Sequence, residues 1–136
     1  MKKKTILLID DYEPTNILHE EFIKTHVNTA TVFSFTDAYK ALESLNHPDE
    51  SERIVPDIIF LDINMPAISG WEFLEIYKTL KIKNKQNINI YMLSTFDDDK
   101  YRNRANEDDT VKKYYTKPLT KEILQQSLYD SISINS

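Results

Sequence analysis

The chain of 136 residues has no cysteine and a single glycine, Gly70. The lack of cysteine excludes disulfides and thiolate metal sites, and it suits a reducing cytoplasm. An average sequence of this length would contain roughly nine or ten glycines. The one glycine that remains is therefore expected at a backbone position that other residues tolerate poorly, such as a turn with a positive φ angle.

Long apolar runs and an excess of basic residues are also missing. No run approaches the roughly 20 apolar residues of a transmembrane helix, and Ile6–Ile9 is shorter than the roughly 7–15 residues of a signal-peptide core. The formal net charge is −5, whereas nucleic-acid-binding proteins usually carry a basic excess. These features predict a cytoplasmic protein whose partners are neither membranes nor nucleic acids.

Apolar, strand-like stretches alternate with helix-like stretches along the chain. Strands are expected at Thr5–Asp10, Thr29–Ser34, Asp57–Asp62, Ile88–Ser94 and Lys113–Thr116. Helices are expected at Pro14–Thr25, Asp37–Leu45, Gly70–Leu80, Asp98–Asn106 and Lys121–Ile132. This alternation predicts a parallel sheet with helices on both faces, and the unbroken runs ILLI and IIFL are typical of central strands buried on both sides. We expect one α/β domain over residues 1–136, with no output domain.

Capping patterns support several helix boundaries. Ser69 followed by Glu72 predicts a capping box ahead of the third helix. Thr120 is a suitable N-cap for the last helix, and Asp97–Asp99 is interpreted as capping for the fourth helix. The histidines are interpreted as surface or structural residues: His19, His26 and His47.

Polar side chains follow four of the predicted strands at their carboxyl ends. Asp10 and Asp11 follow the first strand, Asp62 ends the third, Ser94 ends the fourth, and Lys117 follows the fifth. Parallel α/β sheets bind ligands at this edge. A buried aspartate is also costly unless it is paired, coordinated or chemically used. The sequence therefore predicts one polar site built from these five residues.

The residue types indicate metal-assisted phosphoryl chemistry. Three carboxylates that lie close together repel one another, and a divalent cation removes the conflict. Oxygen ligands with spare positions suit Mg²⁺. Lys117 and Ser94 could then hold the oxygens of a transferred phosphoryl group, and Asp62 is a competent nucleophile of the aspartyl-phosphate kind. Each motif alone is weak, since Asp-Asp after a strand is often only a turn or a cap, but the ordered combination is specific.

Four motifs carry a resemblance to a known family: IDD (9–11), LDINMPAISG (61–70), LSTF (93–96) and YYTKPL (114–119). With them the whole chain resembles the receiver domain of bacterial two-component response regulators, and most of all the single-domain type exemplified by the chemotaxis regulator. The resemblance implies a flavodoxin-like fold, a doubly wound sheet of five parallel strands in the order 2-1-3-4-5 with helices on both faces.

The resemblance also implies a role for each acidic residue of the site. Asp62 is expected to be the phosphoacceptor. Asp11 is expected to bind Mg²⁺ directly and Asp10 largely through water. Asn64 is expected to add its backbone carbonyl to the metal.

Three further residues take roles from the same resemblance. The Ser94 hydroxyl is expected to follow the phosphoryl group, and Lys117 to bridge to it, with a cis peptide bond before Pro118. Tyr114 matches the aromatic residue that changes rotamer on activation. Movement of Ser94 toward the phosphoryl group is expected to vacate space that Tyr114 fills.

Three positions depart from the family pattern. Ser69 replaces an acidic residue before the glycine, and Thr95 is bulkier than the usual alanine or glycine. Lys112 stands where a small alanine is usual. The first two are expected to alter access or kinetics, and the third to affect the packing under the fifth strand. None removes a reacting group.

The expected function is that of a stand-alone receiver rather than an enzyme acting on an external substrate. It would take a phosphoryl group from a sensor histidine kinase or phosphotransfer protein and catalyse only its own phosphorylation and dephosphorylation. Its output would be contact with a protein target through the fourth helix, fifth strand and fifth helix, or onward transfer in a phosphorelay.

Two alternatives stay open at this point. A phosphatase with an aspartate nucleophile also combines a strand-end Asp with Mg²⁺. That class uses a second Asp, two residues after the nucleophile, as its general acid, and this chain has Asn64 at that position. Turnover of an external phosphate ester would favour it. The other alternative is an interaction module that has lost phosphorylation, which a failed phosphorylation assay would support.

The lifetime of the phosphorylated state depends on a water molecule aligned behind the phosphorus. Side chains two places after the acceptor and two places after the hydroxyl residue flank that approach, and here they are Asn64 and Phe96. Asn64 can hydrogen-bond a water but is a poor base, and Phe96 offers no polar group. A well-placed acid or base contributes about 10²–10⁴-fold to such a step, so we expect a lifetime of minutes or longer.

Overall fold

The computed structural model describes residues 3–134, and these residues form a five-stranded parallel sheet with the strand order β2-β1-β3-β4-β5. The strands are β1 (Thr5–Ile9), β2 (Thr31–Phe35), β3 (Ile58–Asp62), β4 (Asn89–Ser94) and β5 (Val111–Thr116). The helices are α1 (Glu13–His26), α2 (Ala38–Leu45), α3 (Gly70–Thr79), α4 (Asp99–Asn106) and α5 (Lys121–Ile134). The flavodoxin-like fold expected from the sequence is confirmed.

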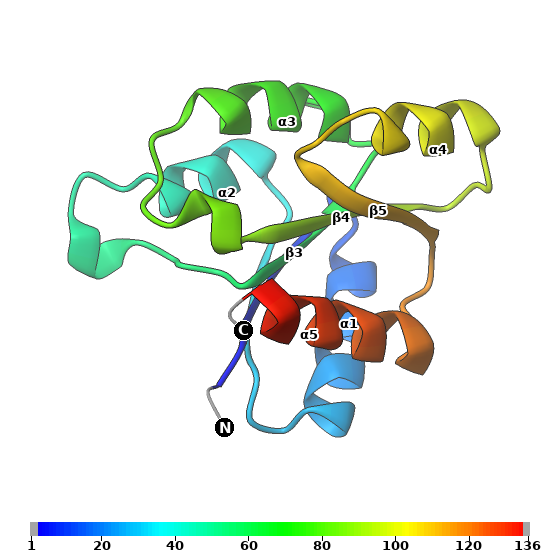
Figure 1. Cartoon of the computed structure of the whole chain (residues 1–136), viewed down its shortest axis with the longest axis horizontal. Coiled ribbons are helices and arrows are strands. Elements are labelled where there is room, and N and C mark those ends of the chain that lie inside the picture. Colours follow the sequence, from blue (N-terminus) through cyan, green and yellow to red (C-terminus); the bar gives the residue numbers. More distant parts are fainter. Residues whose placement is uncertain (1–2, 135–136) are drawn as a thin grey trace.

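Helices cover the two faces of the sheet unequally: α2, α3 and α4 lie on one face, and α1 and α5 lie on the other (Figure 1). Successive residues of β1 serve opposite faces. Leu7 packs into the core under α2 and α3, whereas Leu8 packs into the core that includes Ile23 of α1 and Leu124 of α5. This two-sided burial explains why β1 and β3 have unbroken apolar runs rather than alternating patterns.

The edge strands differ most from the boundaries that the sequence suggested. β2 begins two residues later than expected because it is an edge strand with exposed residues, so its apolar pattern is weak. β5 begins at Val111 rather than at Lys113. Its register shifts by one residue, so that Ile90 pairs with Val111 and Tyr91 pairs with Lys113.

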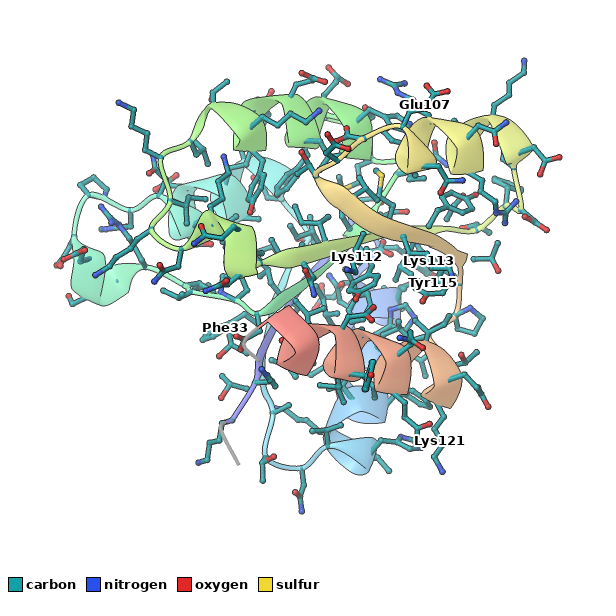
Figure 2. The ribbon with its side chains drawn as sticks, viewed as in Figure 1. Phe33, Glu107, Lys112, Lys113, Tyr115 and Lys121 are labelled. Carbon is teal, nitrogen blue, oxygen red and sulfur yellow. The ribbon has the colours of Figure 1, made fainter. Side chains whose placement is uncertain are left out.

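The register shift places Lys112 in a β-bulge, where one extra residue leaves the ladder. Its side chain is exposed, as is that of Lys113 beside it on β5 (Figure 2). The expected disturbance of the packing under β5 is therefore avoided, because the bulge turns the long charged side chain away from the core.

Gly70, the first residue of α3, has no positive φ angle, so the expectation of a positive-φ turn is wrong. The glycine is instead required by close approach. A Cβ atom at this position would lie 2.6 Å from the backbone oxygen of Asp62 and 3.0 Å from the Cα atom of Ile63. The Gly70 amide also donates to the Ile63 carbonyl at 2.7 Å. The only glycine of the chain thus lets α3 begin directly against the end of β3.

The expected helix caps are present. The Ser69 hydroxyl accepts from the Glu72 amide at 3.1 Å, and the Glu72 carboxylate accepts from the Ser69 amide at 3.0 Å, which completes the capping box. Asp98 caps α4 through its carboxylate, and the Thr120 hydroxyl accepts from the Ile123 amide. Between residues 3 and 134, no helix combines the length and apolarity needed to cross a membrane.

Candidate functional site

Three aspartates converge at the carboxyl edge of the sheet. Asp10 directly follows β1 beside Asp11, and Asp62 is the last residue of β3. One carboxylate oxygen from each lies within 4.8 Å of the others. Asp10 and Asp62 are each only 5% exposed, whereas Asp11 is exposed. Strand order explains the arrangement, because β1 and β3 are neighbours and end at the same edge.

The ammonium group of Lys117 compensates the negative charge of the two buried carboxylates, Asp10 and Asp62. Its ammonium nitrogen lies 2.5 Å from an Asp10 oxygen and 3.0 Å from an Asp62 oxygen. The Lys117 backbone amide donates to the Ser94 carbonyl at 2.8 Å, which fixes the start of the β5–α5 loop against the end of β4. The peptide bond between Lys117 and Pro118 is cis.

The pKa values of Asp62 and Lys117 are both raised, but for different reasons. Burial and the nearby negative charge of Asp10 raise the pKa of Asp62 to about 6, although Lys117 opposes the shift. For Lys117, burial alone would lower the pKa, but the hydrogen bond to Asp10 and the charge of Asp62 raise it overall. The site therefore favours the charged form of Lys117 and disfavours the charged form of Asp62.

The raised pKa of Asp62 predicts that the stability of the metal-free protein depends on pH. Because the folded state raises the pKa of Asp62, its contribution to stability is lost as pH rises from about 4 through about 6. We expect Asp62→Asn to stabilise the protein in EDTA at pH 7 by up to about 3 kcal/mol, and to have little effect at pH 4. Urea denaturation across this pH range measures the difference.

The control for this prediction is Asp11→Asn, which changes an exposed member of the same cluster. The change at Asp11 should alter stability less than the change at Asp62. A lower stability of Asp62→Asn than of the unmodified protein at pH 7 would contradict the prediction.

The donor set suits a hard divalent cation. Three carboxylates face one ammonium group, so two of their negative charges are not balanced by a cation within the described cluster. Carboxylate oxygens with room for water ligands are the coordination that Mg²⁺ and Mn²⁺ accept. Asn64, whose backbone carbonyl is the further predicted ligand, lies exposed two residues beyond Asp62.

Two buried polar residues of α1, Asn16 and His19, support the site. Asn16 was not predicted from the sequence, whereas His19, predicted to be a surface or structural residue, is buried and structural. The Asn16 side-chain amide donates to the Asp10 carbonyl at 2.9 Å and to the Phe35 carbonyl at 3.2 Å, and so ties the ends of β1 and β2 to α1. His19 accepts from the Leu119 amide at 3.3 Å through Nε2. Burial and the neighbouring Lys117 lower the pKa of His19. Asn16 and His19 are three residues apart, which places them on one face of α1. This spacing of two polar residues was the sequence signal that could have shown a polar, buried helix face.

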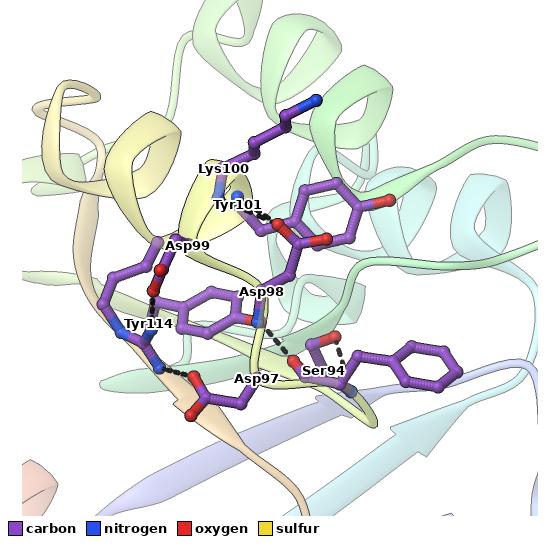
Figure 3. A network of polar contacts seen from close by, with 9 residues as sticks. Ser94, Asp97, Asp98, Asp99, Lys100, Tyr101 and Tyr114 are labelled. Atoms are coloured by element: carbon purple, nitrogen blue, oxygen red, sulfur yellow. Dashed lines mark hydrogen bonds and ion pairs between the residues drawn. The ribbon is translucent and has the colours of Figure 1, made fainter.

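Ser94 is the last residue of β4 and borders the segment that leads into α4. Its side chain is fully buried, and its hydroxyl oxygen accepts from the Phe96 amide at 3.1 Å (Figure 3). The same segment is held from the other side by Tyr114, whose hydroxyl donates to the Phe96 carbonyl at 2.5 Å and accepts from the Asp98 amide at 3.4 Å. Ser94 of β4 and Tyr114 of the neighbouring β5 thus both hold the segment that leads into α4.

Tyr114 is only 4% exposed, so its side chain lies in the interior. The guanidinium of Arg102 lies 5.0 Å from its ring centroid and pairs with Asp97 and Asp99, which places a charged network over the buried ring (Figure 3). The expected change of the Tyr114 rotamer on activation stays a prediction. Asp97 and Asp99 form these ion pairs, and Asp98 alone caps α4.

Comparisons with known proteins agree with this geometry. The family model of the response regulator receiver domain matches residues 6–129. A two-component response regulator from Cytophaga hutchinsonii is similar at 31% identity, with 97% of this chain and 99% of that chain covered and a TM-score of 0.88. A receiver protein from Dyadobacter fermentans is 24% identical over 96% of this chain and 98% of its own, with a TM-score of 0.83.

A third solved structure, the Mn²⁺-bound form of response regulator Rcp1, is 26% identical over 91% of this chain and 88% of its own, with a TM-score of 0.70. A comparison with curated protein sequences found no match. The match to the family model covers most of the chain, and it agrees with the strand order and with the acidic cluster beside Lys117. The chain therefore belongs to the family of response regulator receiver domains.

Proposed function

We propose that this receiver accepts a phosphoryl group on Asp62 from a phosphohistidine of a sensor histidine kinase or phosphotransfer protein, with Mg²⁺ as cofactor. The observation that supports this most directly is the placement of Lys117 between Asp10 and Asp62, since it unites an acceptor carboxylate, a cation and a metal-ligand cluster in one buried site. The similar response regulator Rcp1 has been solved in an Mn²⁺-bound form, which supports a divalent cation at such a cluster.

In the proposed transfer, an oxygen of Asp62 forms a bond to phosphorus while the bond from phosphorus to the donor imidazole nitrogen breaks. The electron pair of the broken bond stays on the imidazole. Lys117 is placed to neutralise a phosphoryl oxygen, and the Ser94 hydroxyl, whose oxygen accepts from Phe96, keeps its proton for donation to another. Bound Mg²⁺ would supply further charge neutralisation. Transfer of this kind depends on positioning and electrostatics more than on acid–base chemistry.

A small phosphodonor tests the proposal without a partner protein. Acetyl phosphate with Mg²⁺ should add one phosphoryl mass to the intact protein, and Asp62→Asn or EDTA should each abolish the addition, because the nucleophile or the cation is then missing. Asp109→Asn, at an exposed aspartate outside the site, should leave it unchanged. An adduct that persists in Asp62→Asn would show that the acceptor is a different residue.

We further propose that the phosphorylated state signals through the face formed by α4, β5 and α5, either to a protein target or by onward transfer. Ser94 and Tyr114 both contact the segment that enters α4, so a displaced Ser94 hydroxyl would act on that segment. Beryllofluoride, a mimic of the phosphoryl group, should shift backbone amide resonances across α4, β5 and α5. Shifts confined to residues around Asp62 would contradict a switch that reaches this face.

A further inference from the structure

Tyr101 of α4 reaches the loop that follows the acceptor strand. Its hydroxyl lies 3.4 Å from the side-chain oxygen of Asn64, the residue two places after Asp62. A tyrosine hydroxyl can donate to an amide oxygen, whereas the amide oxygen can only accept. The contact therefore joins α4 to the β3–α3 loop directly beside the acceptor.

The ring of Tyr101 is held in place by contacts on several sides. Its backbone amide donates to the capping carboxylate of Asp98 at 3.3 Å (Figure 3). The ring packs edge-on against Trp71 of α3, with 6.0 Å between centroids. Trp71 is 7% exposed, and the Arg104 guanidinium lies 4.3 Å from its ring centroid. The hydroxyl of Tyr101 is thus placed at Asn64 by packing rather than by the single hydrogen bond.

We propose that Tyr101 is a positioning residue that lengthens the life of the phosphorylated state by engaging the side-chain oxygen of Asn64. This inference rests on the proposed phosphorylation of Asp62. In hydrolysis, a water oxygen bonds to phosphorus, the bond from phosphorus to the Asp62 oxygen breaks with its electron pair left on the carboxylate, and a water proton passes to solvent. Among side chains, that of Asn64 is the nearest in sequence to Asp62 that can accept a hydrogen bond from such a water.

Occupation of that oxygen by Tyr101 lowers its capacity to orient the water and fixes the direction of the carboxamide. Phe96, the other residue expected to flank the approach of the water, has an apolar side chain and offers no acceptor in place of Asn64. Removal of the Tyr101 hydroxyl should free Asn64 and speed hydrolysis. Because a neutral hydrogen bond is involved, the expected acceleration is about two- to tenfold.

The test measures phosphate release from purified phosphoprotein with Mg²⁺ after removal of acetyl phosphate. Tyr101→Phe removes the hydroxyl and keeps the ring that packs on Trp71. It should release phosphate about two- to tenfold faster than the unmodified protein. Tyr129→Phe, at an exposed tyrosine of α5, is the matched control and should not change the rate.

A double-mutant cycle separates action through Asn64 from a general effect on α4. Tyr101→Phe should have no effect on release in an Asn64→Ala background. In the unphosphorylated protein, Tyr101→Phe should also shift the resonances of the Asn64 side-chain amide. An unchanged or slower release in Tyr101→Phe, or an equal acceleration in the Asn64→Ala background, would overturn the proposal. Failure of the unmodified protein to take up phosphate would overturn the proposed function itself, and this inference with it.

Discussion

Replacement of Lys117 by methionine should reduce the rate of phosphorylation by about 10²–10³-fold and destabilise the metal-free protein. The rate falls because a preorganised charge at a reacting oxygen typically contributes that much. The stability falls because Lys117 is the cation placed between Asp10 and Asp62, which are both buried. Removal of one partner from a buried pair costs about 3–5 kcal/mol, since it leaves an uncompensated charge.

The two effects of this substitution can be measured separately. Urea denaturation in EDTA gives the loss of stability, which should shrink as the pH falls and Asp62 takes up a proton. Adding Asp62→Asn to Lys117→Met should restore much of the lost stability and leave phosphorylation absent. Lys117→Arg keeps the positive charge, but a planar guanidinium replaces the compact ammonium group. We therefore expect a phosphorylation rate between those of Lys117→Met and the unmodified protein. Equal stability of Lys117→Met and the unmodified protein at pH 7 would show that the ion pairs do not stabilise the fold.

Replacement of Gly70 by alanine should destabilise the protein by about 1–3 kcal/mol and slow phosphorylation of Asp62. Overpacking of a filled core has costs of this size. The added Cβ atom would meet the Asp62 carbonyl oxygen at 2.6 Å and the Cα atom of Ile63 at 3.0 Å, and both belong to the backbone. Relief of the clash requires the end of β3 to move, and this segment carries Asp62, the proposed acceptor.

A second substitution distinguishes backbone from side-chain strain at this position. The third close atom is the terminal methyl carbon of Met92, also at 3.0 Å. Adding Met92→Val to Gly70→Ala should therefore recover little, because the backbone contacts remain. Denaturant midpoints and phosphorylation rates are the measurements. Alanine is normally favoured over glycine in a helix by about 0.5–1 kcal/mol, so a rise in stability would show that the close approach imposes no strain.

The sequence determined the fold and the membership of the site because both follow from short-range patterns. The unbroken apolar runs of β1 and β3 are typical of central strands, and the alternation of strands with helices predicts a parallel sheet. Parallel strands end at one edge, so Asp10, Asp11, Asp62, Ser94 and Lys117 had to gather there. The distances among them could not be predicted, since residues up to 107 positions apart meet only through packing of the helices between.

Tertiary structure alone decided four features that local patterns misjudged or could not show. Gly70 meets the backbone of β3, so its requirement is space rather than a positive φ angle. The Lys112 side chain lies outside the core because of a bulge in β5, and that bulge depends on the pairing register between β5 and β4. Tyr114 is buried beneath Arg102, and the Tyr101 hydroxyl reaches Asn64 across the surface. Each depends on how two elements pack, because a side chain's surroundings are set by the neighbouring element and not by its own sequence pattern.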